Sequence, residues 1–179
     1  MGMETIIKEL EQSSKNIRND KIDEFIGNIK NHKKIFVYGT GRSGLMLKAL
    51  AMRLMQMGLN AYVVGETTTP SIQKGDLLIV ASASGETKSV CLMAEAAAEQ
   101  GADIFVISSD PKSALGRIKV PDIVIRSATK FAGSEVSVQP LGSLFEQMLL
   151  VIFDTIILEM NRQQERSEKD MAQRHASLE

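Results

Sequence analysis

Two segments rich in glycine and hydroxyl side chains could bind an anion. Residues 39–44 (Gly-Thr-Gly-Arg-Ser-Gly) directly follow an apolar run that ends at Tyr38, and residues 82–87 (Ser-Ala-Ser-Gly-Glu-Thr) follow one that ends at Ala81. Each segment opens a stretch with helical spacing. Hydroxyl and backbone N–H donors therefore converge at two helix N-termini, where the helix dipole also favours negative charge. This chemistry suits the phosphate group of a small phosphorylated molecule.

Two alternatives stay open for these segments. Ser and Thr often cap helices, so any single hydroxyl could serve the backbone alone. The presence of two such segments at successive strand ends favours anion binding over capping alone. Hydrogen bonds to a charged group contribute about 1.5–3 kcal/mol each, so several donors together could hold a phosphate group. Residues 39–44 also match the G-x-G-x-x-G pattern of dinucleotide-binding folds, and Glu66 follows where those folds carry a ribose-binding acid. That alternative is disfavoured because the chain leaves no room for a substrate domain.

One carboxylate could act as a general base. Glu146 stands near the start of the last helical segment, and Pro140 is expected in its first turn, where helices tolerate proline. Apolar residues flank Glu146, namely Leu144, Phe145 and Met148. Burial of the carboxylate beside these apolar side chains would raise the pKa of Glu146, whereas a helix N-terminus would lower it, so the net direction stays open. An ordinary N-terminal helix charge is the alternative role.

The chain holds only two histidines and one cysteine. His175 shares a helical face with Met171 and Leu178, so a tail helix would turn it toward whatever it packs on; a frayed end is the alternative. His32 lies in a polar turn and is expected to be solvated, and Cys91 is expected in the core. This inventory excludes a disulfide framework and a Cys/His zinc site, and we expect neither metal nor cofactor.

The elements that must position these residues follow from the apolar pattern. Runs rich in β-branched residues predict strands buried on both faces, at residues 35–38, 61–64, 77–80, 104–107 and 123–125. Helical patterns lie at about residues 43–57, 87–100 and 139–162. The alternation predicts an α/β fold, a three-layer doubly wound sandwich around a five-stranded parallel sheet. Ligands bind at the carboxyl edge of such a sheet, where residues 39–44 and 82–87 should meet.

Two further features concern helices. Two short N-terminal helices are predicted, with Asp20 as the expected cap of the second; their apolar stripes are Ile6, Leu10 and Ile17, then Ile22, Phe25, Ile26 and Ile29. Residues 45–57 are apolar almost all round, whereas a helix on a sheet needs only one apolar stripe. We therefore expect an oligomer that covers the second face; a helix enclosed within the monomer is the alternative.

Composition bounds the remaining possibilities. The 179 residues carry 21 Lys+Arg and 22 Asp+Glu, a net charge of −1, and 44% are hydrophobic, which predicts one domain with a substantial core. With 4% aromatic residues and no basic run, we expect no nucleic-acid partner. Residues 141–160 contain three acidic residues, and the chain start shows no secretory signal, so we expect no membrane association and a cytoplasmic protein.

Longer blocks carry a resemblance. They include Gly-Arg-Ser-Gly at 41–44, Ala-Met-Arg-Leu-Met at 51–55, Val-Val-Gly-Glu-Thr-Thr-Thr-Pro at 63–70, Gly-Asp-Leu-Leu-Ile at 75–79, Ser-Gly-Glu-Thr at 84–87, Gln-Pro-Leu-Gly-Ser-Leu-Phe-Glu-Gln at 139–147 and the closing Arg-His-Ala-Ser-Leu-Glu. Together these blocks resemble the 6-phospho-3-hexuloisomerase family, which belongs to the sugar isomerase (SIS) domain family. The resemblance runs essentially from end to end of the chain.

The resemblance implies a flavodoxin-like SIS domain over residues 1–179. It would comprise N-terminal helices at 1–30, an α/β core at 34–160 and an intersubunit helical tail at 161–179. The implied enzyme is a homotetramer that interconverts D-arabino-hex-3-ulose 6-phosphate and D-fructose 6-phosphate through an enediolate. It would work in the ribulose monophosphate pathway, coupled to hexulose-phosphate synthase. The alternative is a non-catalytic sugar-phosphate-binding module, because SIS domains also serve in regulators.

The resemblance also implies residue roles. The substrate phosphate would contact Ser43 and the loop Ser82, Ala83, Ser84, Gly85, Glu86 and Thr87, with Gly41 and Arg42 as further contacts. Glu146 would accept the proton, and His175 would assist ring opening or proton delivery, reaching a neighbouring subunit's site. The chain departs from the family pattern in carrying Ala83 for Gly, Gln56 for His and Ser177 for Asn.

Overall fold

The computed structural model describes residues 2–127, 137–164, 168–175 and 177. In chain order the elements are α1 (Gly2–Ser14), α2 (Asn19–Asn31), β1 (Lys34–Tyr38), α3 (Gly41–Gln56), β2 (Asn60–Val63), β3 (Leu77–Ser82), α4 (Lys88–Glu99), β4 (Asp103–Ser108), α5 (Ala114–Ile118), β5 (Ile123–Val124), α6 (Ser143–Gln164) and α7 (Glu168–Ala172). Within the described part of the chain, no helix is both long enough and apolar enough to span a bilayer.

The strands form one parallel sheet in the order β2-β1-β3-β4-β5. This confirms the predicted five-stranded, doubly wound fold, and the order is that of flavodoxin-like proteins. The chain runs outward from β1 to β2 and then returns to place β3 on the other side of β1. A crevice therefore opens between the carboxyl ends of β1 and β3, because the connections leave these two ends in opposite directions.

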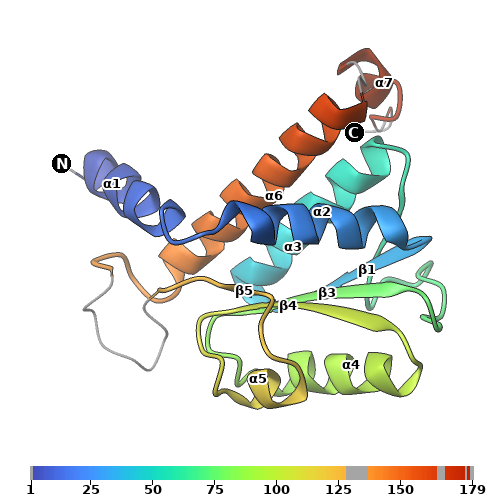
Figure 1. Ribbon diagram of the computed structural model, residues 1–179, viewed down its shortest axis with the longest axis horizontal. Coiled ribbons are helices and arrows are strands. Elements are labelled where there is room, and N and C mark those ends of the chain that lie inside the picture. Colours follow the sequence, from blue (N-terminus) through green and yellow to red (C-terminus); the bar gives the residue numbers. More distant parts are fainter. Residues whose placement is uncertain (1, 128–136, 165–167, 176, 178–179) are drawn as a thin grey trace.

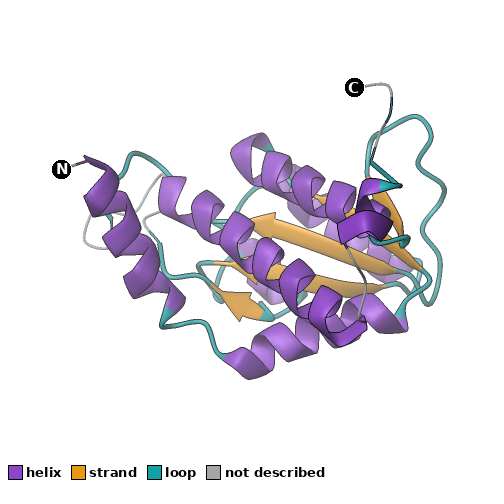
Figure 2. Ribbon diagram, turned by 90° about the horizontal axis from the view of Figure 1, so that it is seen from above, coloured by secondary structure: helices purple, strands orange, loops and turns teal. Residues whose placement is uncertain are grey.

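Helices cover both faces of the sheet (Figures 1 and 2). One face packs on α2, α3 and α6, and the other on α4 and α5. Successive strand residues point to opposite faces, so in β3 Leu77 and Ile79 enter the first core while Leu78 and Val80 enter the second. All six residues of β3 are buried, which is why this strand is a continuous apolar run.

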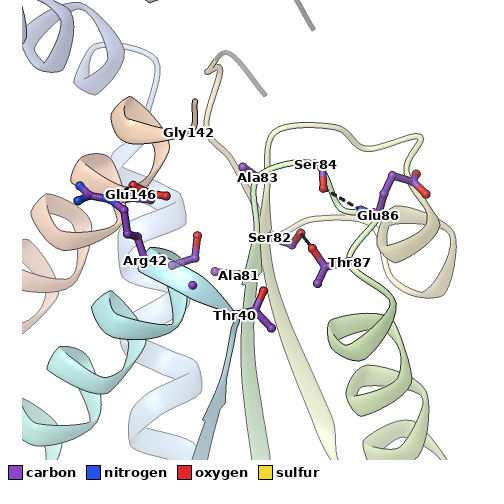
Figure 3. Close-up of a pocket in the computed structure, with 12 residues that line it drawn as sticks. Thr40, Arg42, Ala81, Ser82, Ala83, Ser84, Glu86, Thr87, Gly142 and Glu146 are labelled. Carbon is purple, nitrogen blue, oxygen red and sulfur yellow. Dashed lines mark hydrogen bonds and ion pairs between the residues drawn. The ribbon is translucent and has the colours of Figure 1, made fainter. Parts of the chain in front are cut away.

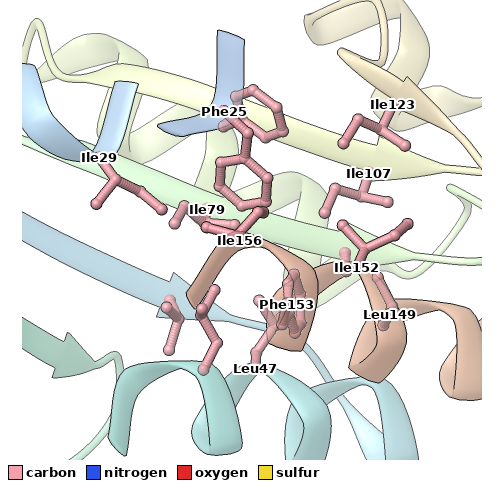
Figure 4. Packing of buried hydrophobic residues seen from close by; sticks show 14 of the residues in the cluster. Phe25, Ile29, Leu47, Ile79, Ile107, Ile123, Leu149, Ile152, Phe153 and Ile156 are labelled. Carbon is pink, nitrogen blue, oxygen red and sulfur yellow. The ribbon is translucent and has the colours of Figure 1, made fainter. Parts of the chain in front are cut away.

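Aromatic contacts join three elements of the larger core, α2, β4 and α6; Figure 4 shows Phe25 and Phe153 within this core. The ring of Phe25 in α2 stacks on Phe105 in β4 with centroids 4.0 Å apart, and it meets Phe153 of α6 edge-on at 6.2 Å. These contacts bring α2 and α6 together over the sheet. The N-terminus of α6 is thereby held beside the sheet's carboxyl edge.

Three local expectations differ from the structure. The N-cap of α2 is Arg18 rather than Asp20, whose carboxylate instead accepts hydrogen bonds from the Arg18 guanidinium. The helix α6 begins at Ser143, so Pro140 precedes the helix and does not lie in its first turn. The short α5 was not predicted, because its five residues are too few to show a helical period.

The helix α3 is not enclosed within the monomer. Its inner residues pack against the sheet and α6, but several large apolar side chains of α3 and α6 are exposed, namely Leu45, Met52, Met55, Leu150, Val151 and Leu158. The enclosed alternative is therefore wrong for this chain. An apolar face formed by α3 and α6 is left open to solvent.

The expectation that His32 is solvated is also wrong. Its ring is largely covered, with Nδ1 2.7 Å from the Asn28 carbonyl oxygen and Nε2 2.8 Å from Asp103 Oδ2. Burial lowers the pKa of His32, but hydrogen bonds to Asn28 and Asp103 outweigh it and raise the pKa above its usual value. When the ring is protonated, both of its nitrogens can donate, and it ties the end of α2 to the start of β4.

A pH-dependent contribution to stability follows from His32. Because its pKa is higher in the folded chain, the stabilisation is complete below the unfolded value of about 6.5 and is lost as pH rises through the folded value. We expect His32→Gln to abolish this loss. Free energies of unfolding from urea titrations at pH 5.5 and pH 8.5 check it. An equal pH dependence in wild type and variant would contradict the role of the ring.

Candidate active site

A cavity of about 340 Å³ opens at the carboxyl ends of β1 and β3. Its lining comes from three segments that are far apart in the sequence: Thr40, Gly41, Arg42 and Ser43; Ala81, Ser82, Ala83, Ser84, Glu86 and Thr87; and Gly142 with Glu146. Figure 3 shows Ser82, Ser84 and Thr87 on one side of the cavity and Arg42 with Glu146 on the other. The two predicted segments therefore meet at the sheet's edge, and the start of α6 joins them.

The first segment turns sharply from β1 into α3. A Cβ atom at Gly44 would lie 2.4 Å from the Gly39 carbonyl oxygen, so only glycine allows the two backbones to approach this closely. The helix begins at Gly41, and its first-turn N–H groups have no intrahelical acceptor. The turn therefore places the backbone N–H groups of the first turn of α3 at the cavity wall, where Arg42 and Ser43 lie.

The second segment is shaped by its own hydroxyls. Ser82 Oγ accepts from the Gly85 N–H at 3.1 Å and shares a hydrogen bond of 3.1 Å with Thr87 Oγ1. Ser84 Oγ accepts from the Glu86 N–H at 3.2 Å. The Ser84 hydroxyl, which accepts here, still has its proton to donate, whereas in the Ser82–Thr87 pair one hydroxyl donates to the other and the second keeps its proton. These side chains thus hold the loop and keep donor capacity for an anion.

Gly85 and Glu86 contribute differently from the rest of this loop. Gly85 does not line the cavity; it has a φ of +64°, and a Cβ there would lie 2.0 Å from Ser113 Oγ. Glu86 lines the cavity, but its Oε1 accepts from the Ala114 N–H at 2.8 Å, so the carboxylate serves the start of α5. A carboxylate cannot donate to phosphate, and the Glu86 N–H already donates to Ser84 Oγ, so Glu86 shapes the loop and offers no free donor there.

Glu146 lies in the first turn of α6, on the opposite side of the cavity. Its side chain is 14% exposed, and its Oε2 accepts a hydrogen bond from Arg42 Nε. A Cβ built at Gly142 would lie 3.7 Å from Glu146 Oε1, so the absent side chain keeps this oxygen uncovered. The ion pair orients the carboxylate, with one oxygen held by Arg42 and the other available for proton transfer.

The structure does not bring His175 to this cavity. The helix α7 ends at Ala172, and His175 lies after it, beside Gln56 at the far end of α3. A helix of 16 residues rises roughly 24 Å, which separates His175 from Glu146 within one chain. Gln56 is buried there, with Oε1 accepting from Arg53. Leu178, predicted to share the face of His175, lies outside the described residues.

The dinucleotide alternative is not supported. Glu66 does not line the cavity; its carboxylate lies 3.9 Å from the Lys48 ammonium, and both side chains are exposed. The strand order also differs from the 3-2-1-4-5-6 order of dinucleotide-binding folds. Among the residues that the structure describes, no cluster of three or more His, Cys, Asp or Glu side chains is arranged to hold a metal ion.

Sequence reasoning missed the pairing of Arg42 with Glu146 and the contributions of Thr40, Ala81 and Gly142. The paired residues are 104 positions apart, and no local pattern links them. Gly142 could have been recognised, because a glycine directly before a helix that carries a candidate base is suited to leave room at that base.

Comparisons with known proteins identify relatives of this chain. The SIS domain family model matches residues 28–152. The 3-hexulose-6-phosphate isomerase of Bacillus subtilis is 40% identical over 178 residues, covering 97% of this chain and 95% of that protein. That of Mycobacterium gastri is 44% identical over 147 residues, covering 82% and 74%. A Methanococcus jannaschii crystal structure, from which a function of 3-hexulose-6-phosphate isomerase was inferred, has a TM-score of 0.83 at 32% identity and 99% coverage of both chains.

Replacing Gly85 tests the packing behind the hydroxyl loop. Gly85→Ala should lower the free energy of unfolding by about 2 kcal/mol or more, because the added methyl meets Ser113 and φ is positive. Gly27→Ala is the control, since a Cβ in the middle of α2 has open space and should stabilise the helix by about 0.5–1 kcal/mol. Urea unfolding measures both, and equal stability of the two variants would contradict the loop geometry.

Proposed function

The chain belongs to the SIS domain family, and from that premise we propose that it is a sugar-phosphate isomerase of the ribulose monophosphate pathway. The proposed reaction interconverts D-arabino-hex-3-ulose 6-phosphate and D-fructose 6-phosphate. The observation that carries the proposal is the two-sided cavity, with anion-binding donors on one side and an oriented carboxylate on the other. The identity of 40% with the Bacillus subtilis isomerase across nearly the whole chain supports the substrate.

The substrate phosphate would bind between the two loops. Hydroxyls of Ser43, Ser82, Ser84 and Thr87 and the first-turn N–H groups of α3 supply its donors. Gly41 and Ala83 would contribute backbone contacts. Because the phosphate is remote from the reacting carbons, its binding energy would serve to orient C2 and C3 against Glu146.

Glu146 is the proposed proton shuttle. Its Oε1 would remove the proton from C2, and the electron pair would pass through the C2–C3 bond to the C3 carbonyl oxygen, giving an enediolate. The proton would return to C3 as the carbonyl forms at C2, with a proton moving from the C2 hydroxyl to the C3 oxygen. Arg42 would fix Glu146 and place positive charge beside the enediolate. The shuttle needs no covalent intermediate.

The proposed function also has consequences for how the chain assembles and where it works. We propose a homo-oligomer, a tetramer, formed through the α3 and α6 apolar face. His175 would act in a neighbouring subunit's site, because within its own chain it lies at the far end of α3. The whole chain would form one SIS domain with the N-terminal helices and tail attached to its core. It would act in the cytoplasm on the product of hexulose-phosphate synthase.

Glu146→Gln tests the shuttle. We expect turnover to fall by about 10²- to 10⁴-fold, because an amide cannot accept the proton, while the affinity for fructose 6-phosphate changes little. Production of fructose 6-phosphate from ribulose 5-phosphate, formaldehyde and a synthase measures turnover. Glu159→Gln, on the same helix, is the matched control. Unimpaired turnover would remove Glu146 from the mechanism, and an inactive wild type that binds sugar phosphate would favour the non-catalytic module.

Charge substitutions test the oligomer interface. Met52 of α3 and Leu150 of α6 are exposed and line one shallow cavity, so they lie on the same face. We expect Met52→Glu and Leu150→Glu each to lower the mass in analytical ultracentrifugation, because a buried unpaired carboxylate is costly. Leu92→Glu, at an equally apolar exposed position on α4, should leave the mass unchanged. An unchanged mass in both interface variants would contradict this surface.

A further inference from the structure

A carboxylate of the N-terminal helix holds the segment that leads into α6. Glu9 Oε2 accepts hydrogen bonds from Ser137 Oγ at 2.7 Å and Gln139 Nε2 at 2.8 Å, and its Oε1 accepts from the Val138 N–H at 2.8 Å. Ser137 itself is buried. The helix α1 lies outside residues 28–152, which match the family model. This anchor therefore joins a helix outside the matched residues to a segment inside them.

The hydrogen bonds continue from this anchor into the catalytic helix. Gln139 Oε1 accepts from Gln147 Nε2 at 2.8 Å, and Gln147 directly follows Glu146. The chain between the two glutamines contains Gly142, which lines the cavity. Both ends of this stretch are thus linked to Glu9, one directly and the other through Gln139.

The held segment has a backbone that needs such support. Leu141 has a φ of +57°, and a left-handed conformation costs a residue with a side chain roughly 1 kcal/mol or more. Conformations of this kind persist where the surroundings impose them. Here the hydrogen bonds of Glu9 lie directly before the strained residue, and the Gln139–Gln147 hydrogen bond spans it.

The number of donors explains why a carboxylate stands at this position. Two ionised oxygens can accept from all three donors, whereas an amide has a single acceptor oxygen. Slight burial raises the pKa of Glu9, but the hydrogen bonds from Gln139, Ser137 and Val138 outweigh it and lower the pKa below its usual value. The side chain is therefore charged at neutral pH.

We propose that Glu9 is a positioning residue, which anchors residues 137–142 and thereby sets the place of Gly142 and Glu146 in the cavity. The proposal rests on the proposed function of Glu146. An effect of Glu9 on the site can be told apart from an effect on core stability. The helix α1 stands at the end of the molecule away from most of the sheet (Figure 1), and Ser13 is its only buried residue. Loss of the anchor should disturb the site while the sheet and its helices stay folded.

Glu9→Ala and Glu9→Gln test the anchor. We expect kcat of Glu9→Ala to fall by about tenfold or more with KM changed much less, since small displacements of a reacting group are costly while the phosphate loops are untouched. Glu9→Gln should lie between this variant and wild type. Glu11→Ala is the matched control, because Glu11 is exposed on the same helix and its carboxylate pairs with Lys15 at 2.8 Å. A kcat for Glu9→Ala equal to that of Glu11→Ala would overturn the proposal.

Hydrogen exchange supplies a readout that does not need activity. Amides of residues 141–147 should exchange faster in Glu9→Ala than in wild type or Glu11→Ala, with β3 and β4 unaffected. Ser137→Ala should add little to Glu9→Ala, because the two residues share one interaction. If wild type lacks isomerase activity, the proposed function fails, and the exchange rates still test the anchor. Equal exchange at residues 141–147 in all variants would overturn it.

Discussion

The chain reversal between β1 and β3 is the constraint on which the site depends. The two strands are adjacent and parallel, yet the connection from β1 leads outward to β2 and that from β3 leads to β4. Their carboxyl ends therefore release α3 and α4 in opposite directions, and the N-terminal ends of both helices face one crevice. Backbone N–H groups and hydroxyls gather there because of topology, so a phosphate site needs no lysine.

The two sides of the crevice have different electrostatic character. The hydroxyl loop is held by hydrogen bonds among Ser82, Thr87 and Gly85, and its one carboxylate is turned to the start of α5. The opposite side carries the Arg42–Glu146 ion pair, which joins α3 to α6. An anion would meet neutral donors on one side and a compensated pair on the other. Pairing with Arg42 would reduce the repulsion between the Glu146 carboxylate and such an anion.

The helix α1 and the C-terminal tail lie outside the matched SIS region and make the contacts described above away from the centre of the sheet. Through Glu9, α1 reaches the segment before α6, and the tail places His175 beside the far end of α3. The open apolar face of α3 and α6 lies between these additions. The matched region thus carries the two loops proposed to hold the phosphate, while α1 contacts the segment that leads into α6.

The sequence alone determined the strands, the main helices and the two loops rich in glycine and hydroxyl side chains, because hydrophobic period and such clusters are local properties of the chain. It also singled out Glu146. Only the tertiary structure decided that Arg42 holds this carboxylate, that Glu9 anchors Ser137, and that His32 meets Asp103. These partners are between 71 and 128 positions apart. Their contacts depend on how separate elements pack against one another, and a single sequence carries no local pattern for distances between such elements.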